Sequence, residues 1–131
     1  MHVRIQPKDV YEPVKGLYTQ VIACVEGPRF EIAGTLPYLP DGSLEPELVQ
    51  QCIVMMENLR ASLESVDLVP SDVVRIQVYT TRMDEFLKKA IGIVFGFFGD
   101  ERPTSTLVEI SRLANPAVLI EMDASAVRAP R

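Results

Sequence analysis

Two short apolar segments near the start of the chain have the composition of strands. Leu17–Val25 (LYTQVIACV) and Phe30–Leu36 (FEIAGTL) are rich in β-branched and aromatic residues, which fit a pleated surface better than a helix. Between them lies Glu26-Gly27-Pro28, a cluster that favours a turn. The pattern predicts a β-hairpin made of these two strands.

A helical period follows from residue 48. Apolar side chains then recur every three or four residues, which places them on one face of a helix; they are Leu48, Cys52, Met55, Leu59, Leu63 and Val66. Glu45-Pro46-Glu47 suits the first turn, since negative charge meets the positive helix end there and proline loses no hydrogen bond. A second helix is predicted over Met83–Phe98, weakened by two glycines that each cost about 1 kcal/mol relative to alanine.

Alternation with the period of a strand returns between and after the helices. In Val73–Thr80 (VVRIQVYT) apolar and polar residues alternate, as in a strand with one buried face. Two more strands are predicted within Arg102–Arg128, joined by a hairpin turn at Ala114-Asn115-Pro116. Their face away from the helices is predicted to carry Ser105, Leu107, Glu109, Leu119, Glu121 and Asp123. This mixture suits a wet subunit interface or open solvent.

The order of these elements is strand, strand, helix, strand, helix, strand, strand. It predicts an α+β fold, in which one mixed or antiparallel sheet carries both helices on a single face. The chain has 131 residues, the size of one ordinary domain, so residues 1–131 are predicted to form a single domain.

Charge and hydropathy exclude two classes of partner. The net charge is −5, and the 13 lysines and arginines are scattered along the chain. Binding to nucleic acid needs clustered cations that displace counterions from the phosphates, so no nucleic acid partner is predicted. The longest apolar run, Ala90–Phe98, is far shorter than the roughly twenty residues of a membrane span. A cytoplasmic protein that binds no membrane is therefore expected.

Several kinds of catalytic site lack their essential residues. His2 is the only histidine, and it lies in a terminus expected to fray, so a nucleophile–histidine triad has no base. Cys24 and Cys52 stand in apolar segments without the spacing of metal ligands and are predicted to be buried free thiols. No zinc ligand set and no phosphate-binding glycine loop is present. Neither a metal nor a cofactor is predicted.

Near the end of the chain, residues 103–113 read PTSTLVEISRL, and residues 119–124 read LIEMDA. These segments resemble the signature of the Rid family, also called YjgF or L-PSP. Members of that family carry a proline, a ligand-binding arginine, the motif V-E-[VI]-x-R-L, and a strand I-E-[IM]-[ED]-A. The resemblance extends over about 17–128. It implies a fold like that of the Bacillus type of chorismate mutase, assembly as a homotrimer, and small-molecule clefts between subunits.

The resemblance also implies a set of site residues. Tyr18, in GLYTQ, matches a tyrosine that lines the cleft, and Gly34, in IAGTLP, matches a glycine whose backbone approaches the ligand. Glu121 matches a glutamate that positions water for hydrolysis. An ion pair of Glu121 with Arg75, Arg112 or a neighbouring subunit would explain this carboxylate without any reaction.

The arginine of the signature is replaced in this chain. Ser105 stands at its place, with Thr106 and Leu107 beside it as further candidate ligand contacts. Arginine holds a carboxylate through two charge-assisted hydrogen bonds, each worth about 1.5 to 3 kcal/mol. A serine at that place is therefore expected to weaken carboxylate binding by roughly 10² or more.

Two functional hypotheses follow from the replacement. In the first, the protein is an atypical Rid-type hydrolase that deaminates an enamine or imine other than 2-iminopropionate, with Glu121 orienting the water. In the second, it is a non-catalytic trimer that binds or senses a small, rather apolar metabolite between subunits. A purely structural subunit of a larger assembly is a third reading.

Overall fold

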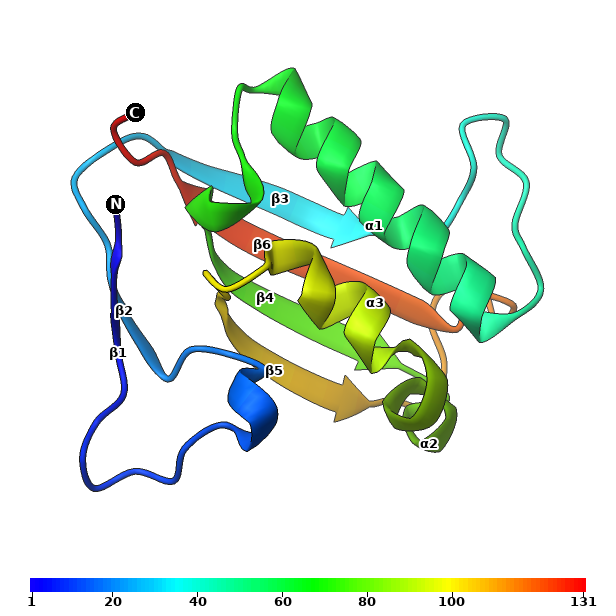
Figure 1. The fold of residues 1–131 in the computed structure, drawn as a ribbon. Coiled ribbons are helices and arrows are strands. Elements are labelled where there is room, and N and C mark those ends of the chain that lie inside the picture. The colour runs from blue at the N-terminus through cyan, green and yellow to red at the C-terminus, as the bar shows by residue number, and fades with distance from the viewer.

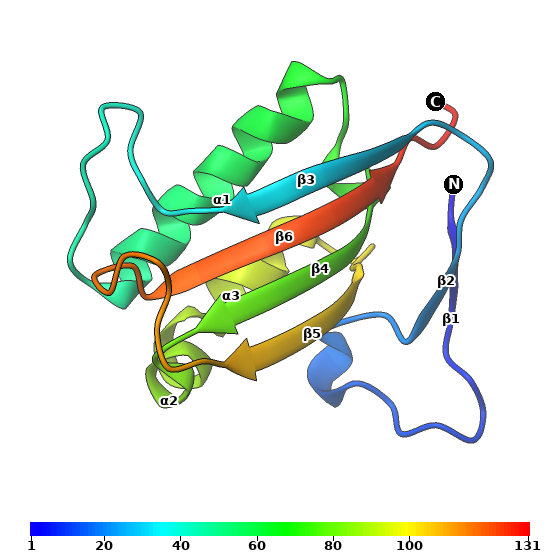
Figure 2. The same ribbon diagram turned by 180° about the vertical axis from the view of Figure 1, so that it is seen from behind.

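The computed structural model describes all residues, 1–131, and is built around a four-stranded sheet (Figure 1). The strands lie in the order β3-β6-β4-β5; they are β3 (Arg29–Thr35), β4 (Val73–Thr80), β5 (Thr104–Glu109) and β6 (Ile120–Val127). β6 pairs antiparallel with β3 and with β4, whereas β5 pairs parallel with β4. The two long helical segments cover one face, and Figure 2 shows the other face without helices. The predicted α+β fold, with two helices on one face of a mixed sheet, is confirmed.

Helix α1 spans Leu48–Ser65 and buries the apolar face that the spacing predicts. One member of that set, Val66, is 37% exposed because it follows the last helical residue. Asp67 adopts a left-handed conformation with φ 56°, and the N–H of Leu68 donates to the carbonyl of Leu63. This turn brings Leu68 into the core in place of Val66.

The second helical segment covers the predicted range, Met83–Phe98, but its winding changes along its length. It consists of α2 (Met83–Glu85), a π-helix (Phe86–Ala90), α3 (Ile91–Phe95) and a 3₁₀ turn (Gly96–Phe98). Its buried positions include Phe86, Ala90, Val94 and Phe98. A steady spacing of four exceeds the 3.6 residues of an α-helical turn, so a wider π turn helps to keep these side chains over the sheet.

Both predicted hairpins are wrong. β2 (Val21–Ala23) pairs antiparallel with β1 (Val3–Ile5) in a separate two-stranded sheet and does not pair with β3. β5 and β6, although consecutive along the chain, are separated by β4. β4 and β6 take the two central places, and their apolar residues on the helix side are almost completely buried. Such strands suit the centre of a sheet because a central strand is shielded from water at both edges.

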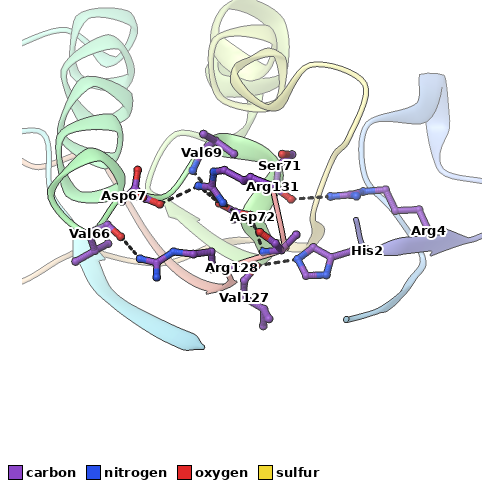
Figure 3. A network of polar contacts seen from close by, with 11 residues as sticks. His2, Arg4, Val66, Asp67, Val69, Ser71, Asp72, Val127, Arg128 and Arg131 are labelled. Carbon is purple, nitrogen blue, oxygen red and sulfur yellow. Dashed lines mark hydrogen bonds and ion pairs between the residues drawn. The ribbon is translucent and has the colours of Figure 1, made fainter. Parts of the chain in front are cut away.

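Residues 1–23, called the N-terminal arm below, lie beside the ends of β5 and β6 in both views (Figures 1 and 2). His2 is only 5% exposed. Its Nε2 lies 2.8 Å from the carbonyl oxygen of Val127 (Figure 3). Its Nδ1 lies 3.1 Å from the backbone nitrogen of Val25. The expectation that His2 frays is therefore wrong, because both ring nitrogens have backbone partners.

A buried carboxylate ties the C-terminus to the loop before β4 (Figure 3). Asp72 is 1% exposed and accepts hydrogen bonds from the backbone N–H groups of Val69, at 2.9 Å, and Ala129, at 3.1 Å. Arg131 pairs with it at 3.0 Å. These three partners satisfy a charge that would otherwise be costly to bury.

The two cysteines have different environments. Cys52 is fully buried in α1, and burial, assisted by the charge of Glu85, raises the pKa of its thiol to about 12. Cys24 is exposed, so the prediction that it is buried is wrong; it follows β2 in the arm and does not enter the core. No helix has the length and apolar character needed to cross a membrane.

Candidate functional site

Glu121 lies on the helix-free face of the sheet, against a glycine of the neighbouring strand. β6 carries Glu121, and β3 carries Gly34 next to an irregularity where the pairing register shifts between Ile32 and Thr35. A methyl group added to Gly34 would come within 2.9 Å of the carboxyl carbon of Glu121. The missing side chain of Gly34 therefore leaves the room that the carboxylate occupies, and the structure brings these two predicted site residues together.

A tyrosine and a second carboxylate share this face with Glu121. Tyr79 of β4 pairs directly with Glu121 across the strands, and its hydroxyl lies 3.4 Å from a carboxylate oxygen of Asp123. Burial raises the pKa of Tyr79, and the negative charges of Asp123 and Glu121 raise it further. Alternation in β4 and β6 placed Tyr79 and Asp123 on this face, although the sequence did not mark them as site residues.

No basic side chain within the chain neutralises Glu121. None of the four ion pairs among residues 1–131 includes it. Arg75 donates to a neighbouring glutamine of its own strand, and Arg112 donates to two backbone carbonyls. The alternative that Glu121 serves an ion pair with Arg75 or Arg112 is therefore wrong for the single chain, and a partner on a neighbouring subunit stays a prediction.

The same face has a second polar pair near the other end of β6. Ser125 is 8% exposed, and its hydroxyl donates to Glu31 of β3 at 2.5 Å. This hydrogen bond, together with Arg29 at 2.6 Å, lowers the pKa of Glu31. The helix-free face is thus lined by carboxylates whose partners are mainly hydroxyl groups.

Ser105 and Leu107 lie on the opposite, helix-covered side, which corrects the predicted face. In the parallel pairing of β4 and β5, Ser105 stands beside Ile76 and Leu107 beside Val78. Ile76 and Val78 are fully buried in the core, and Leu107 packs against that core. Alternation within β5 shows which residues share a face, but only the pairing with β4 decides which face it is.

The structure also fixes the positions of three further residues, Thr106, Glu109 and Leu119. Thr106 pairs with Gln77 on the helix-free face and is exposed. Glu109 accepts a hydrogen bond from the backbone N–H of Met83 at 3.1 Å, which places it toward the helical segment, and Leu119 belongs to the core. Of the six residues predicted for the helix-free face, only the two carboxylates of β6 lie there.

Tyr18 occupies a third place, in the N-terminal arm near the start of β5. The next residue, Thr19, donates its N–H to the carbonyl of Pro103 at 3.0 Å and its hydroxyl to that of Arg102 at 2.5 Å. Tyr18 lines an open hollow of about 360 Å³ together with Arg4. Neither Gly34 nor Glu121 reaches this hollow, so the predicted site residues do not converge within one chain.

No metal site accompanies these groups: nowhere in residues 1–131 do three His, Cys, Asp or Glu side chains gather closely enough to hold an ion. The functional groups that the described site offers are therefore carboxylates, hydroxyls and backbone groups. Such groups bind small polar ligands and orient water.

Comparison with known proteins identifies the family. A family model described as Endoribonuclease L-PSP matches residues 11–128. A RutC family protein of Pyrococcus abyssi is 32% identical over 115 residues, which cover 86% of this chain and 87% of that protein. The chain belongs to the Rid family, as the motifs in residues 103–124 indicate.

Solved structures of Rid proteins have the same fold. A Rid family protein of Yersinia pestis, YyfB, gives a TM-score of 0.89 at 24% identity, covering 97% of this chain and 98% of that one. The crystal structure of Escherichia coli TdcF with bound serine gives a TM-score of 0.68 at 27% identity, covering 81% and 85%. The full name of TdcF is "Putative reactive intermediate deaminase TdcF".

Proposed function

We propose that this Rid protein assembles as a homotrimer and hydrolyses an enamine or imine in clefts between its subunits. The observation that supports this proposal best is that the candidate residues are divided between the two faces of one sheet. Gly34 and Glu121 lie on the helix-free face, whereas Ser105 and Leu107 of the edge strand β5 lie on the helix side. Opposite faces of a sheet cannot contact the same small ligand, so a second copy must supply one of the two sets.

Glu121 is the group proposed to orient the water. Its carboxylate has no ion-pair partner within the chain, so its oxygens are free to accept hydrogen bonds from water. Water adds to the carbon of the C=N bond while the nitrogen takes up a proton. The resulting carbinolamine expels ammonia and leaves a carbonyl compound, with Glu121 acting as the general base in the addition.

Ser105 and Leu107 are proposed to select the substrate. A serine hydroxyl offers one neutral donor where an arginine would offer two charge-assisted bonds, so carboxylate binding is roughly 10² weaker. Leu107, which is half-buried against the core, would add apolar surface beside it. We therefore expect a substrate that is larger and less dependent on a carboxylate anchor than 2-iminopropionate; the serine bound to the relative TdcF supports a small-molecule ligand in general.

The test is a set of enamines and imines generated in situ, including 2-aminomuconate and 2-iminopropionate, with release of ammonia as the readout. The wild-type protein should accelerate decay of a larger substrate, and Glu121→Gln should lower the rate by about 10² to 10⁴, the range of general-base effects. Glu64→Gln, at an exposed position of α1, is the matched control. Ser105→Arg should gain turnover of 2-iminopropionate. If no substrate decays faster with the wild-type protein than without it, hydrolysis is not its function.

A second candidate function is the binding of a small metabolite without catalysis. It is supported by the environment of Ser105: within residues 1–131, no hydrogen bond or ion pair holds an arginine side chain beside this serine. A ligand at about 100 times its dissociation constant stabilises a protein by about 2.7 kcal/mol, which a thermal-shift screen detects. Shifts without product formation would favour this function over hydrolysis.

RNA is not proposed as a substrate, despite the description of the family model. The open sheet face carries Glu31, Glu121 and Asp123 alongside Arg29 and Arg75, and the whole chain has a net charge of −5. An excess of carboxylates without clustered cations does not favour a phosphate backbone. No salt-dependent binding of single-stranded RNA is expected in a filter-binding assay.

A further inference from the structure

Exposed apolar side chains are concentrated in the N-terminal arm. Seven of the ten large hydrophobic residues that are exposed lie within the first 21 residues; they are Met1, Val3, Ile5, Val10, Tyr11, Val14 and Val21. Single exposed apolar residues are ordinary, but a concentration of them in one segment is typical of an interaction surface.

The arm turns an apolar face to solvent. In its two-stranded sheet, Val3 pairs with Ala23 and Ile5 pairs with Val21, and all four residues are exposed. The intervening Arg4 points to the body of the protein, where its Nε donates to the carbonyl of Arg102 at 3.1 Å. An isolated two-stranded sheet is marginally stable in water, so this orientation leaves an apolar surface that a partner would cover.

Four strand edges are unpaired, those of β1, β2, β3 and β5, and the edges of β2 and β3 bear on this inference. β2 pairs only with β1, and β3 pairs only with β6, so each leaves a row of backbone donors and acceptors open to another strand. The free edge of β3 borders a groove of about 270 Å³ between β3 and α1, and the groove is lined by Phe30, Ile32, Ala33 and Val66 among others. The arm and this edge therefore offer complementary groups: a free strand with an apolar face, and a free strand beside an apolar groove.

The arm of the same chain does not reach this edge. His2 is bonded to Val127, and Arg4 donates to the carbonyl of Ser71 at 3.4 Å (Figure 3). Arg4 also donates to the carbonyl of Glu101 at 3.0 Å. Further along, Thr19 bonds to the start of β5. The likeness to the Yersinia pestis crystal structure covers 97% of the chain and so includes the arm. While these contacts hold, the free edge of β3 is open to another molecule.

We propose that β2 of one chain adds as an extra strand to the free edge of β3 in a second copy. The exposed face of the arm would then cover the groove between β3 and α1 of that copy. Charge favours the same pairing, because residues 1–23 carry three basic and two acidic side chains, whereas residues 24–131 carry ten basic and sixteen acidic ones. The arm and the rest of the chain thus carry opposite net charges, which favour association of the arm of one copy with the body of another. This strand exchange is independent of the ligand chemistry proposed above.

Cross-linking between two differently tagged chains tests the exchange. One chain keeps Cys24, which is exposed at the end of β2, while Cys52 is buried and unreactive. The other carries Cys24→Ser and Ala33→Cys, which puts its only exposed thiol on β3. After co-expression and treatment with a short bifunctional maleimide, we expect a product that contains one chain of each kind. A second chain with Lys88→Cys in place of Ala33→Cys is the control and should give no such product.

The outcomes separate exchange from its alternatives. If the mixed product is absent, the proposal is overturned. A chain that has both Cys24 and Ala33→Cys gives a second check. If this chain is cross-linked only within itself, the arm folds back on its own β3 and the proposal is also overturned. Sedimentation gives an independent measure: Ile5→Asp with Val21→Asp should weaken self-association at least tenfold, and Tyr11→Asp, outside the strands, should weaken it less. Association as tight as wild type in the double variant would contradict the exchange even if the enzyme proved active.

Discussion

Replacing Gly34 by alanine is expected to displace the Glu121 carboxylate while changing folding stability little. The backbone at Gly34 has no positive φ, so alanine is compatible with its conformation. The added methyl group would lie 2.9 Å from the carboxyl carbon of Glu121, whereas ordinary contacts of this kind begin at 3.4 Å. The carboxylate oxygen Oε2 would lie closer still to the methyl group. The carboxyl group must therefore retreat by about 0.5 to 1 Å, and it can do so because it ends a flexible side chain.

The magnitude follows from two opposing terms. Forcing Glu121 away from its preferred rotamer costs about 0.5 to 1.5 kcal/mol, while a glycine-to-alanine change at a compatible site stabilises by about 0.4 to 1 kcal/mol through the unfolded chain. The net effect should lie between about 0.5 kcal/mol of stabilisation and about 1.1 kcal/mol of destabilisation. A misplacement of about 1 Å costs roughly 10² in rate, so a shift of about 0.5 to 1 Å in a water-orienting carboxylate should lower turnover by about ten- to a hundredfold.

A double-mutant cycle measured by urea unfolding isolates the contact. In the background Glu121→Ala the methyl group no longer meets a carboxylate, so Gly34→Ala should stabilise there by the full 0.4 to 1 kcal/mol or so, and the coupling energy should be about 0.5 to 1.5 kcal/mol. Gly92→Ala, where a methyl group meets nothing within 4 Å, is the control and should leave turnover unchanged. A loss above about 3 kcal/mol for Gly34→Ala, or a coupling energy of zero, would refute the assignment of Gly34 as the residue that makes room for Glu121.

Three further predictions concern the core, the thiols and the helix-free face. Phe86→Ala should lower the free energy of unfolding by about 3 to 5 kcal/mol, because Phe86 is fully buried and its removal leaves a cavity; a urea titration measures this. A maleimide at pH 8 should label Cys24 only, since the pKa of Cys52 is raised to about 12 and the thiolate is the reactive form; mass spectrometry should find two labels only after denaturation. Ser125→Ala should raise the pKa of Glu31 toward its usual value, because the lowered pKa depends first on that hydroxyl. Glu31 contributes stability above its unfolded pKa that is lost as pH falls through its folded pKa, so acid unfolding of this variant, followed by carboxyl NMR, should show a smaller contribution from Glu31.

Local periodicity was enough to find most of the elements and the family. The spacing of Leu48 to Leu63 predicts α1 and its buried face, and the alternation of Val73–Thr80 predicts β4 with its apolar side toward the helices. These patterns are reliable because the repeat of a helix or a strand is a property of the local backbone, and the burial of one side imposes it on neighbouring residues. The motifs of residues 103–124 similarly identified the Rid family, since a short signature is read directly from the chain.

The candidate site, by contrast, depends on contacts between residues far apart in the chain. The contact of Gly34 with Glu121 joins residues on different strands through a register shift that neither strand shows by itself. Ser105 was predicted to share a face with Glu121, but β4 lies between their strands and its parallel pairing turns Ser105 toward the helices. Within the arm that carries Tyr18, β2 likewise pairs with β1 instead of β3, and the arm is held at the start of β5 and the end of β6.

The sequence by itself thus determined the elements, the helical and strand faces, and the family, because each of these is encoded by residues close together in the chain. Only the tertiary structure decided which strands are neighbours, which side of the sheet each alternating set occupies, and where the N-terminal arm is anchored. The physical reason is that period-two alternation specifies two equivalent faces. The choice between those faces is made by long-range backbone pairing and by the burial of the whole core.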